Sequence, residues 1–267
     1  MGSRIDGECL TGGFAIGVQA WSFIKFTAFE AIEKTAAAGG KVIELVPGQR
    51  LSRETGKAGL DHNSPAGVIA KARAKLAACG VKAVNYGCCG LPNDERECGR
   101  VFEFARRMGL YALTSEPDPK AFDLIERLAK RYDVRVAIHN HPGNPKWPDY
   151  RYWDPRYVLS LVRGRDRRIG ACADTGHWIR SGVNPLKALR MLKGRIVSCH
   201  LKDLHKAGPD GHDVPYGTGV GKVTAVLDEL KRQKFAGNIS IEYEHNWSKS
   251  VPDIAQCIGF VRGYGQK

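Results

Sequence analysis

Short apolar runs alternate with longer amphipathic stretches along most of this chain. Each run is brief and rich in aliphatic or β-branched residues, which is typical of strands that are buried on both faces. The runs are FAIGVQ (14–19), KVIELV (41–46), VKAVNY (81–86), LYALTS (110–115), VRVAIHN (134–140), RIGACAD (168–174), RIVSCHL (195–201) and NISIEYE (238–244). The pattern predicts eight strands.

A stretch with helical spacing follows each predicted strand. The predicted helices cover residues 27–39, 64–80, 93–109, 118–132, 154–164, 184–194, 221–235 and 250–265. Their ends carry the expected signals. The helix over 93–109, for example, has Asn93 as its expected cap, acidic residues early, basic residues late and Gly109 at its end.

Eight strand–helix units in 267 residues predict a single-domain α/β fold, the (β/α)8 TIM barrel, over residues 14–267. A doubly wound open sheet is the alternative. Against it, the first strand lacks a GxGxxG turn, and polar residues end many strands instead of clustering at one switch point. Residues 1–13 are predicted to form a flexible N-terminal arm.

The composition is that of an ordinary globular protein, with 43% hydrophobic and 26% charged residues. No apolar run approaches the roughly 20 residues that span a bilayer, and no secretory signal is present, so we expect no membrane partner. The default expectation is a cytoplasmic protein, or an exported one if a native signal has been trimmed. The eight cysteines form no CxxC pair, which argues against a zinc ribbon and favours reduced, structural thiols.

The formal charge of +13 raises the question of an anionic partner. The basic residues fall mostly in the helix-like stretches, as in Arg163, Arg165, Arg167 and Arg168, and such residues are usually solvated. No stretch interleaves aromatic and basic residues as nucleic-acid-binding surfaces do. We therefore expect no nucleic-acid partner.

Polar signatures end the last five of the eight apolar runs. They are LTSEP with Glu116, AIHNHP with His139 and His141, ADTGHW with Asp174 and His177, SCHLKD with His200 and Lys202, and SIEYEH with Glu242 and Glu244. Because the carboxyl ends of parallel strands meet at one mouth of a barrel, we expect these side chains to share a pocket. Carboxylate oxygens and imidazole nitrogens around a common point are ligands for a divalent metal.

Three of these residues are the strongest candidate metal ligands. Asp174 ends its strand and would point into the mouth, although it could also serve as a turn or capping residue before Gly176. His200 stands in an otherwise apolar strand and accompanies the other strand-end groups. Glu242 lies deeper than Glu244, so Glu242 is the expected ligand and Glu244 either contacts substrate or forms a salt bridge at the rim.

The remaining strand-end residues have two interpretations each. His177 lies just past its strand and is expected to face substrate. Lys202 would bind a substrate oxyanion, or pair with Asp203 or another carboxylate. Glu116 would act in the pocket, or stabilise the start of the next helix. His139 would face the centre as a ligand or an acid–base group.

Other polar residues could complete a substrate-binding wall. His141 sits nearer the loop than His139 and could reach substrate hydroxyls. In the first half of the chain, Gln19, Trp21, Glu44 and Asn85 lie near the ends of the first three predicted strands. Hydrogen-bonded filling of the barrel interior is the alternative role for these four residues.

With these motifs in this order, the chain resembles the sugar phosphate isomerase/epimerase superfamily, the xylose isomerase-like barrels. The resemblance runs from GVQAWSF to SVPDIAQC and is most specific in GGKVIELVPGQ, DTGHW, HLKD and IEYEHNW. It implies one divalent metal ion, with Mn²⁺ favoured over Mg²⁺, Co²⁺ or Zn²⁺, and a small-molecule sugar, keto sugar or glycoside as substrate. Asp174, His200 and Glu242 match three of the usual ligand positions.

The resemblance has one departure. Ketose epimerases of this kind take their fourth ligand from a glutamate at the end of the fifth strand, where this chain has His139. Glu116 on the preceding strand is expected to supply the missing carboxylate. The predicted metal ligands are therefore Glu116, Asp174, His200 and Glu242, and the predicted catalytic residues are Glu116, His139 and Glu242.

The chemistry implied by the resemblance is removal of a proton next to a carbonyl through an enediolate. Returning the proton isomerises or epimerises a sugar, whereas expelling a β-substituent eliminates. A sugar isomerase or epimerase is the predicted function, and a 3-keto-glycoside lyase or keto-sugar hydratase or dehydratase is the alternative. Endonuclease IV shares the barrel, but it needs a richer set of histidines. Sugar binding without turnover and assembly into a homo-oligomer both stay open.

Overall fold

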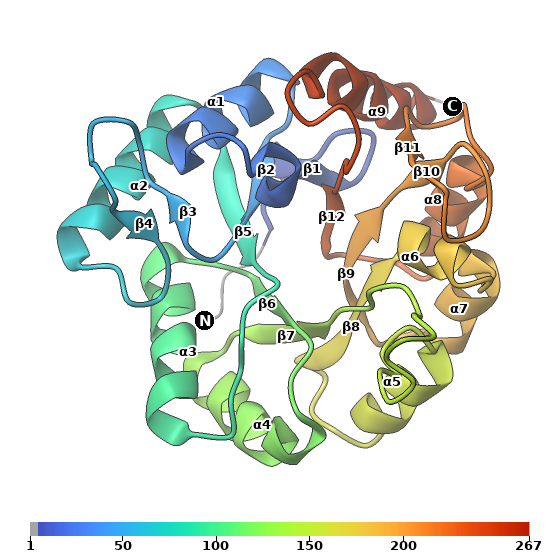
Figure 1. Ribbon diagram of the computed structural model, residues 1–267, viewed down its shortest axis with the longest axis horizontal. Coiled ribbons are helices and arrows are strands. Elements are labelled where there is room, and N and C mark those ends of the chain that lie inside the picture. Colours follow the sequence, from blue (N-terminus) through green and yellow to red (C-terminus); the bar gives the residue numbers. More distant parts are fainter. Residues whose placement is uncertain (1–4, 267) are drawn as a thin grey trace.

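Eight parallel strands close into a barrel in this computed structural model, which describes residues 5–266 (Figure 1). The barrel strands are β1 (Ala15–Gln19), β2 (Val42–Leu45), β5 (Lys82–Tyr86), β6 (Ala112–Ser115), β7 (Arg135–Ile138), β8 (Ile169–Asp174), β9 (Ile196–Leu201) and β12 (Asn238–Ile241). Each strand pairs with the barrel strands before and after it in the chain, and β12 closes the ring on β1. The predicted (β/α)8 barrel is confirmed.

Helices surround this barrel on the outside (Figure 1). They are α1 (Ala28–Ala37), α2 (Ala66–Ala78), α3 (Glu95–Met108), α4 (Phe122–Tyr132), α5 (Pro155–Val162), α6 (Thr175–Arg180), α7 (Pro185–Met191), α8 (Val223–Arg232) and α9 (Val251–Tyr264), with short 3-10 turns at Gly7–Cys9, Ala20–Phe23 and Pro119–Ala121. The short helix α6 was not predicted, because six residues are too few to show helical spacing. No helix within residues 5–266 combines the length and apolarity needed to cross a membrane.

Two short antiparallel strand pairs lie in the connections that follow β2 and β9. One joins β3 (Gln49–Arg50) to β4 (Gly59–Leu60), and the other joins β10 (Asp203–Leu204) to β11 (Asp213–Val214). Strands of two residues leave no alternating pattern in the sequence, which is why they were not predicted.

The helix boundaries follow local hydrogen bonding. At the start of α1, Thr27 accepts a hydrogen bond from Glu30 N, and the Glu30 side chain accepts one from Thr27 N, which is a capping box. The cap of α3 is Asp94, whose side chain accepts from Glu97 N, and not Asn93 as predicted. That helix does end at Gly109, which adopts a left-handed conformation with φ of 69°.

The chain before β1 packs against the barrel over residues 5–13, which differs from the predicted flexible arm. Cys9 is buried with side chains from the starts of the strands, including Val42, Val84 and Val197. Asp6 pairs with Lys82, and Thr11 bridges to Phe14. This segment therefore covers the amino-terminal mouth, while residues 1–4 of the predicted arm lie outside the described residues.

Two strands end earlier than predicted, at the opposite mouth. β7 stops at Ile138 and β12 stops at Ile241, so His139 and Glu242 each lie one residue past a strand. The backbone there is still held by the barrel, since His139 N donates to Ser115 O at the end of β6 at 2.9 Å. The barrel thus presents these polar side chains at its carboxyl-terminal mouth, where active sites of this fold lie.

Candidate metal centre

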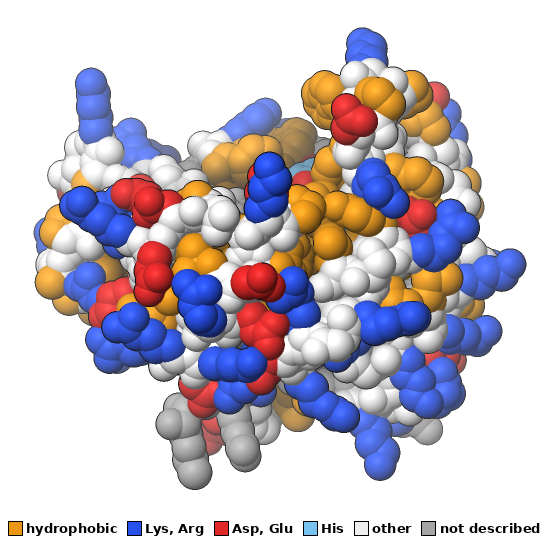
Figure 2. Space-filling view, turned by 90° about the horizontal axis from the view of Figure 1, so that it is seen from below, with side chains coloured by type: hydrophobic (Ala, Val, Ile, Leu, Met, Phe, Trp, Pro, Cys, Tyr) orange, Lys and Arg blue, Asp and Glu red, His pale blue; other side chains and the backbone are white. Residues whose placement is uncertain are grey.

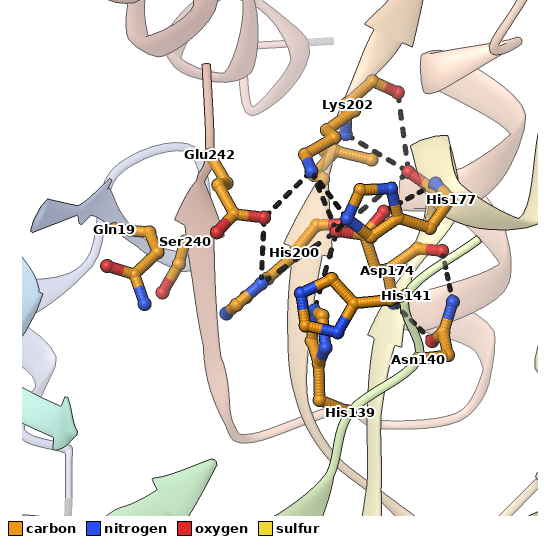
Figure 3. Close-up of polar contacts among 12 residues, drawn as sticks. Gln19, His139, Asn140, His141, Asp174, His177, His200, Lys202, Ser240 and Glu242 are labelled. Carbon is orange, nitrogen blue, oxygen red and sulfur yellow. Dashed lines mark hydrogen bonds and ion pairs between the residues drawn. The ribbon is translucent and has the colours of Figure 1, made fainter. Parts of the chain in front are cut away.

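Four side chains from four neighbouring strand ends meet at the carboxyl-terminal mouth. They are His139 after β7, Asp174 at the end of β8, His200 in β9 and Glu242 after β12, and Figure 3 shows them pointing toward one another. All four are buried, and one ligand atom of each lies within 4.8 Å of those of the other three. We call this set the four-residue cluster.

The facing atoms of the cluster are His139 Nε2, Asp174 Oδ2, His200 Nδ1 and Glu242 Oε2. Among the described residues, none of these atoms has a hydrogen-bond partner, although all are shielded from solvent. Buried polar atoms are almost always satisfied, because an orphaned one costs the free energy of its lost hydration. Four such atoms aimed at one point fit a bound cation, and two nitrogens with two carboxylate oxygens are an ordinary set of ligands for a divalent metal.

Asp174 serves both of the roles that its sequence position suggests. Its Oδ1 accepts a hydrogen bond of 2.7 Å from His177 N and caps α6, while Oδ2 faces the cluster. The Asn140 side-chain amide donates from Nδ2 to Asp174 O and accepts at Oδ1 from Asp174 N, both at 3.0 Å. The cap and this amide bridge hold the carboxylate in one orientation.

A carboxylate holds the far nitrogen of each imidazole in the cluster. His200 Nε2 lies 3.0 Å from Glu44 Oε2, and His139 Nδ1 lies 2.9 Å from Glu116 Oε1. When the imidazole donates to such a partner, the ring is fixed and its other nitrogen is left as the ligand. Two carboxylate–imidazole pairs of this kind flank the cluster.

The sequence predicted Glu116 as the fourth metal ligand. In the structure Glu116 is not a member of the four-residue cluster, and His139 occupies that position. Glu116 Oε1 also lies 2.6 Å from His141 Nδ1 and accepts a hydrogen bond of 2.9 Å from Tyr150 Oη. Glu116, His139 and His141 do form a second group of close donor atoms. Because one oxygen of Glu116 receives all these contacts, the geometry favours an orienting role.

Lys202 places an ammonium group beside the cluster. Its side chain is fully buried, and Nζ lies 3.0 Å from Asp174 Oδ2, 2.7 Å from Glu242 Oε2 and 2.8 Å from Glu244 Oε2. The first two contacts are ion pairs without hydrogen-bond geometry. Lys202 thus shares two carboxylates with any cation in the cluster, and it shares Glu244 Oε2 with Arg180.

The electrostatics of the cluster favour a bound cation. Burial alone would raise the pKa of Glu242, but Lys202 and His200 hold that pKa well below its usual range. Burial alone would lower the pKa of His200, yet the Glu44 and Glu242 carboxylates raise it well above its usual range. The buried carboxylates are therefore stabilised by nearby positive charge. A metal ion can supply that charge while the imidazoles stay neutral.

His177 and Glu244 form the rim with two residues that were not predicted. Arg180 Nη1 lies 3.1 Å from His177 Nδ1 and 3.0 Å from Glu244 Oε2, and Arg180 Nη2 lies 3.1 Å from Asp213 Oδ2. Burial and the nearby Lys202 ammonium hold the pKa of His177 well below its usual range, so its imidazole is neutral. Arg180 could have been found from its helical spacing of three residues from His177, whereas Asp213 carries no comparable signal.

The predicted wall residues of the first half separate into two groups. Trp21 and Gln19 line a cavity of about 220 Å³ together with Glu242, Glu244, His141 and Cys88. The Gln19 amide is already used, since it donates to Gly87 O and accepts from Trp21 N. Glu44 and Asn85 are completely buried below the cavity, so Glu44 supports His200 instead of lining a wall.

A larger cavity of about 760 Å³ adjoins the same mouth. It shares His141 and Glu244 with the smaller one, and it extends beneath the long connection between β7 and α5. Figure 2 shows the hollow at this edge of the molecule, with apolar side chains gathered on the raised part beside it. Of the four-residue cluster, Glu242 lines the smaller cavity, and the larger cavity adjoins that one at His141 and Glu244.

The chain matches the family described as the xylose isomerase-like TIM barrel over residues 32–262. It belongs to this family. Its fold also matches an uncharacterised protein from Parabacteroides distasonis, which is 35% identical with a TM-score of 0.75, over 94% of this chain and 98% of that one. No curated protein sequence matches the chain.

Two further solved structures share the fold at lower identity. One is D-psicose 3-epimerase in the presence of D-fructose, which is 12% identical with a TM-score of 0.72, over 94% of this chain and 99% of that one. The other is a probable 3-DHS dehydratase from Bacillus anthracis, which is 12% identical with a TM-score of 0.68, over 91% of this chain and 97% of that one. At such identity the likeness is one of fold, and the chemistry must be argued from the site.

Proposed function

We propose that this protein is a divalent-metal-dependent sugar isomerase or epimerase, which removes a proton next to a carbonyl through an enediolate. The observation that carries the proposal is the set of four buried, facing atoms of His139, Asp174, His200 and Glu242. Within residues 5–266 none of them has a hydrogen bond, and the Lys202 ammonium lies beside the two carboxylate oxygens. Mn²⁺ is the metal we favour, from the resemblance to the xylose isomerase-like barrels, and Mg²⁺, Co²⁺ and Zn²⁺ are the alternatives. The nitrogen and oxygen donors of the cluster suit a divalent ion.

A divalent ion bound by the cluster would polarise the substrate carbonyl and lower the cost of the charge that develops on its oxygen. The chain's own residues handle the proton. Glu242 reaches the smaller cavity and is kept charged by Lys202, so it is the carboxylate that we assign as the base. His141 and His177 lie at the rim, where they would contact substrate hydroxyls.

The fold comparison supports a sugar substrate without deciding it. D-psicose 3-epimerase has the same architecture over nearly its whole length, which makes a ketose a reasonable first substrate to test. The buried cluster supplies the chemical reason, since a metal beside a carboxylate base is what enolisation of a sugar requires.

One observation favours a lyase or dehydratase as the second candidate. Epimerisation needs a proton acceptor on one face of the substrate and a donor on the other. Glu116, which was expected to act with Glu242, has its Oε1 atom engaged by His139, His141 and Tyr150. A single carboxylate base, Glu242, suits abstraction followed by loss of a β-substituent, and a probable 3-DHS dehydratase occurs among the structures with this fold.

The test is solvent deuterium exchange into keto sugars by the Mn²⁺-loaded protein, followed by NMR, with metal content measured on the same sample. We expect deuterium at the carbon next to the carbonyl, and loss of exchange on chelation. A new ketose or aldose identifies an isomerase or epimerase, whereas an unsaturated product identifies a lyase. A folded sample that binds no divalent metal and exchanges no hydrogen would refute the proposal.

A further inference from the structure

The larger cavity is too spacious for the proposed reaction on a single sugar ring. Its volume of about 760 Å³ is within the roughly 300–1,000 Å³ of pockets that enclose whole drug-sized ligands, whereas the smaller cavity of about 220 Å³ is below that range. The smaller cavity contains Glu242 and so holds the reacting group. The larger one has no assigned occupant.

The two cavities meet at a defined point. His141 and Glu244 line both, so a ligand that fills both cavities lies against these two side chains where the cavities join. The contact of His141 with Glu116 and the contacts of Glu244 with Arg180 and Lys202 fix this junction. A flexible single bond between two rings suits such a junction better than one fused ring system.

The walls of the larger cavity combine apolar and hydrogen-bonding surfaces. Pro142, Pro145, Trp147 and Tyr150 provide the apolar part, and Asn144, His141 and Glu244 provide polar groups. Trp147 is 66% exposed, the highest value among the large hydrophobic residues that are exposed. A pyranose ring has C–H faces that pack on an indole and hydroxyls that pair with amides, so it matches both surfaces.

The connection that carries Trp147 is held in place. Gly143 N donates to Ser181 Oγ at 2.9 Å, and a side-chain Cβ at Gly143 would lie 3.2 Å from the Trp153 ring. Trp147 N donates to Asn144 O at 2.9 Å, and Tyr150 N donates to Trp147 O at 3.0 Å. These bonds fix the backbone that carries the exposed Trp147 side chain.

The charges around this cavity argue against an anionic ligand. Arg180 is the single Lys or Arg among the described residues that line it, and Arg180 is already paired with Asp213 and Glu244. Two acidic residues, Glu116 and Glu244, line the same space. A phosphate group would meet carboxylates without a free cation to balance it.

We propose that the larger cavity binds a second, uncharged sugar ring, so that the substrate is a two-ring keto sugar whose glycosidic link lies against His141 and Glu244. This inference rests on the proposed function for its reacting ring in the smaller cavity. It narrows the substrate class to uncharged disaccharides and glycosides, and it excludes sugar phosphates.

The experiment is calorimetric binding to the full chain, with and without Mn²⁺, of D-fructose, of the fructose-containing disaccharides isomaltulose and lactulose, and of D-fructose 6-phosphate. We expect at least one disaccharide to bind about tenfold more tightly than D-fructose. Trp147→Ala should weaken disaccharide binding about 3- to 10-fold, which is the worth of an aromatic contact, and leave D-fructose unchanged. Trp147→Phe should recover most of the loss.

Lys146→Ala is the matched control, because Lys146 is the exposed neighbour in the same connection and does not line the cavity. It should change neither affinity. The inference is overturned if one-ring and two-ring sugars bind equally, if D-fructose 6-phosphate binds most tightly, or if Trp147→Ala weakens D-fructose as much as the disaccharides.

Failure of this inference differs from failure of the proposed function. If no sugar exchanges deuterium yet disaccharides bind through Trp147, the second-ring site stands and the catalytic proposal falls. If D-fructose exchanges deuterium but disaccharides gain nothing from Trp147, the catalytic proposal stands and the second-ring site falls.

Discussion

The two mouths of this barrel are built from the same strands and have opposite chemistry. At the amino-terminal mouth, Val42, Val84 and Val197 pack around Cys9 and leave no buried charge in their cluster. At the carboxyl-terminal mouth, Asp174, His200 and Glu242 lie buried beside Lys202. The difference lies along single strands: β9 runs from apolar Val197 to His200 within four residues.

This contrast indicates that the two mouths have different roles, one in stability and the other in the chemistry of the candidate site. The apolar mouth contributes free energy of folding through burial, at about 25 cal/mol per Å² of apolar surface. The charged mouth contributes little and costs desolvation, which is repaid when its charges are paired. Changes at one mouth should therefore alter stability, and changes at the other should alter metal binding.

The largest effect is expected from Asp174→Asn. The asparagine can still cap α6 through its side-chain oxygen, but it removes the charge that faces the cluster. We expect metal affinity to fall by at least about 100-fold, more than the loss of an outer partner of a ligand usually costs. Metal titration measures this, and an exposed-site variant, His245→Ala, should behave as the parent. Unchanged affinity would show that the cluster is not the metal site.

The next effect is expected from Glu44→Gln, which keeps the shape of the residue that supports His200. Loss of the carboxylate should lower metal affinity by about 10- to 100-fold, because the imidazole is held less firmly and is less basic. Ser240→Ala is the control, since Ser240 donates a hydrogen bond of 2.6 Å to the same carboxylate and its substitution leaves the Glu44–His200 pair in place. Equal losses in the two variants would mean that packing, and not orientation, accounts for the effect.

A change at the apolar mouth should act on stability alone. Val84→Ala removes two buried methyl groups and should lower the free energy of unfolding by about 2 kcal/mol, with metal affinity unchanged. Urea unfolding of the metal-free protein measures the first quantity, and metal titration measures the second. A parallel fall in metal affinity would show that the two mouths are energetically coupled.

The smallest effect concerns pH. Burial raises the pKa of Asp213 from its ordinary value of 3.8 to about 6. The folded protein holds this proton more tightly than the unfolded chain, so its stabilising contribution is complete below the unfolded pKa and is lost as pH rises through about 6. Between pH 5 and pH 7 the loss is about 1 kcal/mol.

Asp213→Asn should remove that part of the pH dependence, since asparagine does not titrate. The measurement is urea unfolding of parent and variant at pH 5, 6 and 7, and the informative quantity is the difference between the two slopes. Parallel slopes would contradict a raised pKa at Asp213. Val84→Ala, at the apolar mouth, is the control and should keep the parent slope.

The sequence predicted the barrel well because its signals are local and repeated. A strand that is buried on both faces must be apolar, and a helix on its outside must be amphipathic. Each strand–helix unit can therefore be predicted from its own residues, without knowledge of the other units. The short elements α6, β3–β4 and β10–β11 escaped prediction because each is too brief to show a period. Residues 5–13 also escaped, since nothing in a polar opening segment indicates that Cys9 will cover a barrel mouth.

The sequence predicted which residues gather at the candidate site, but it did not predict which of them face one another. Asp174, His200 and Glu242 stand at strand ends, and strand ends converge in any parallel barrel. The sequence could not rank Glu116 against His139, because both follow adjacent strands and differ in depth by amounts that depend on strand tilt and length. In the structure His139 joins the cluster, and Glu116 lies beyond it as its hydrogen-bond partner.

The sequence by itself determined the fold, the mouth at which the polar groups gather and the chemical types of those groups. These three features follow from the spacing of hydrophobic residues and from the order of the strands and helices along the chain, both of which can be taken directly from the sequence. Tertiary structure alone decided which atoms face one another, that Glu44 supports His200 across 156 positions of the chain, and that a second cavity opens beside the cluster. These contacts depend on the distances between strands in the packed barrel, and the hydrophobic pattern of a single strand does not specify those distances.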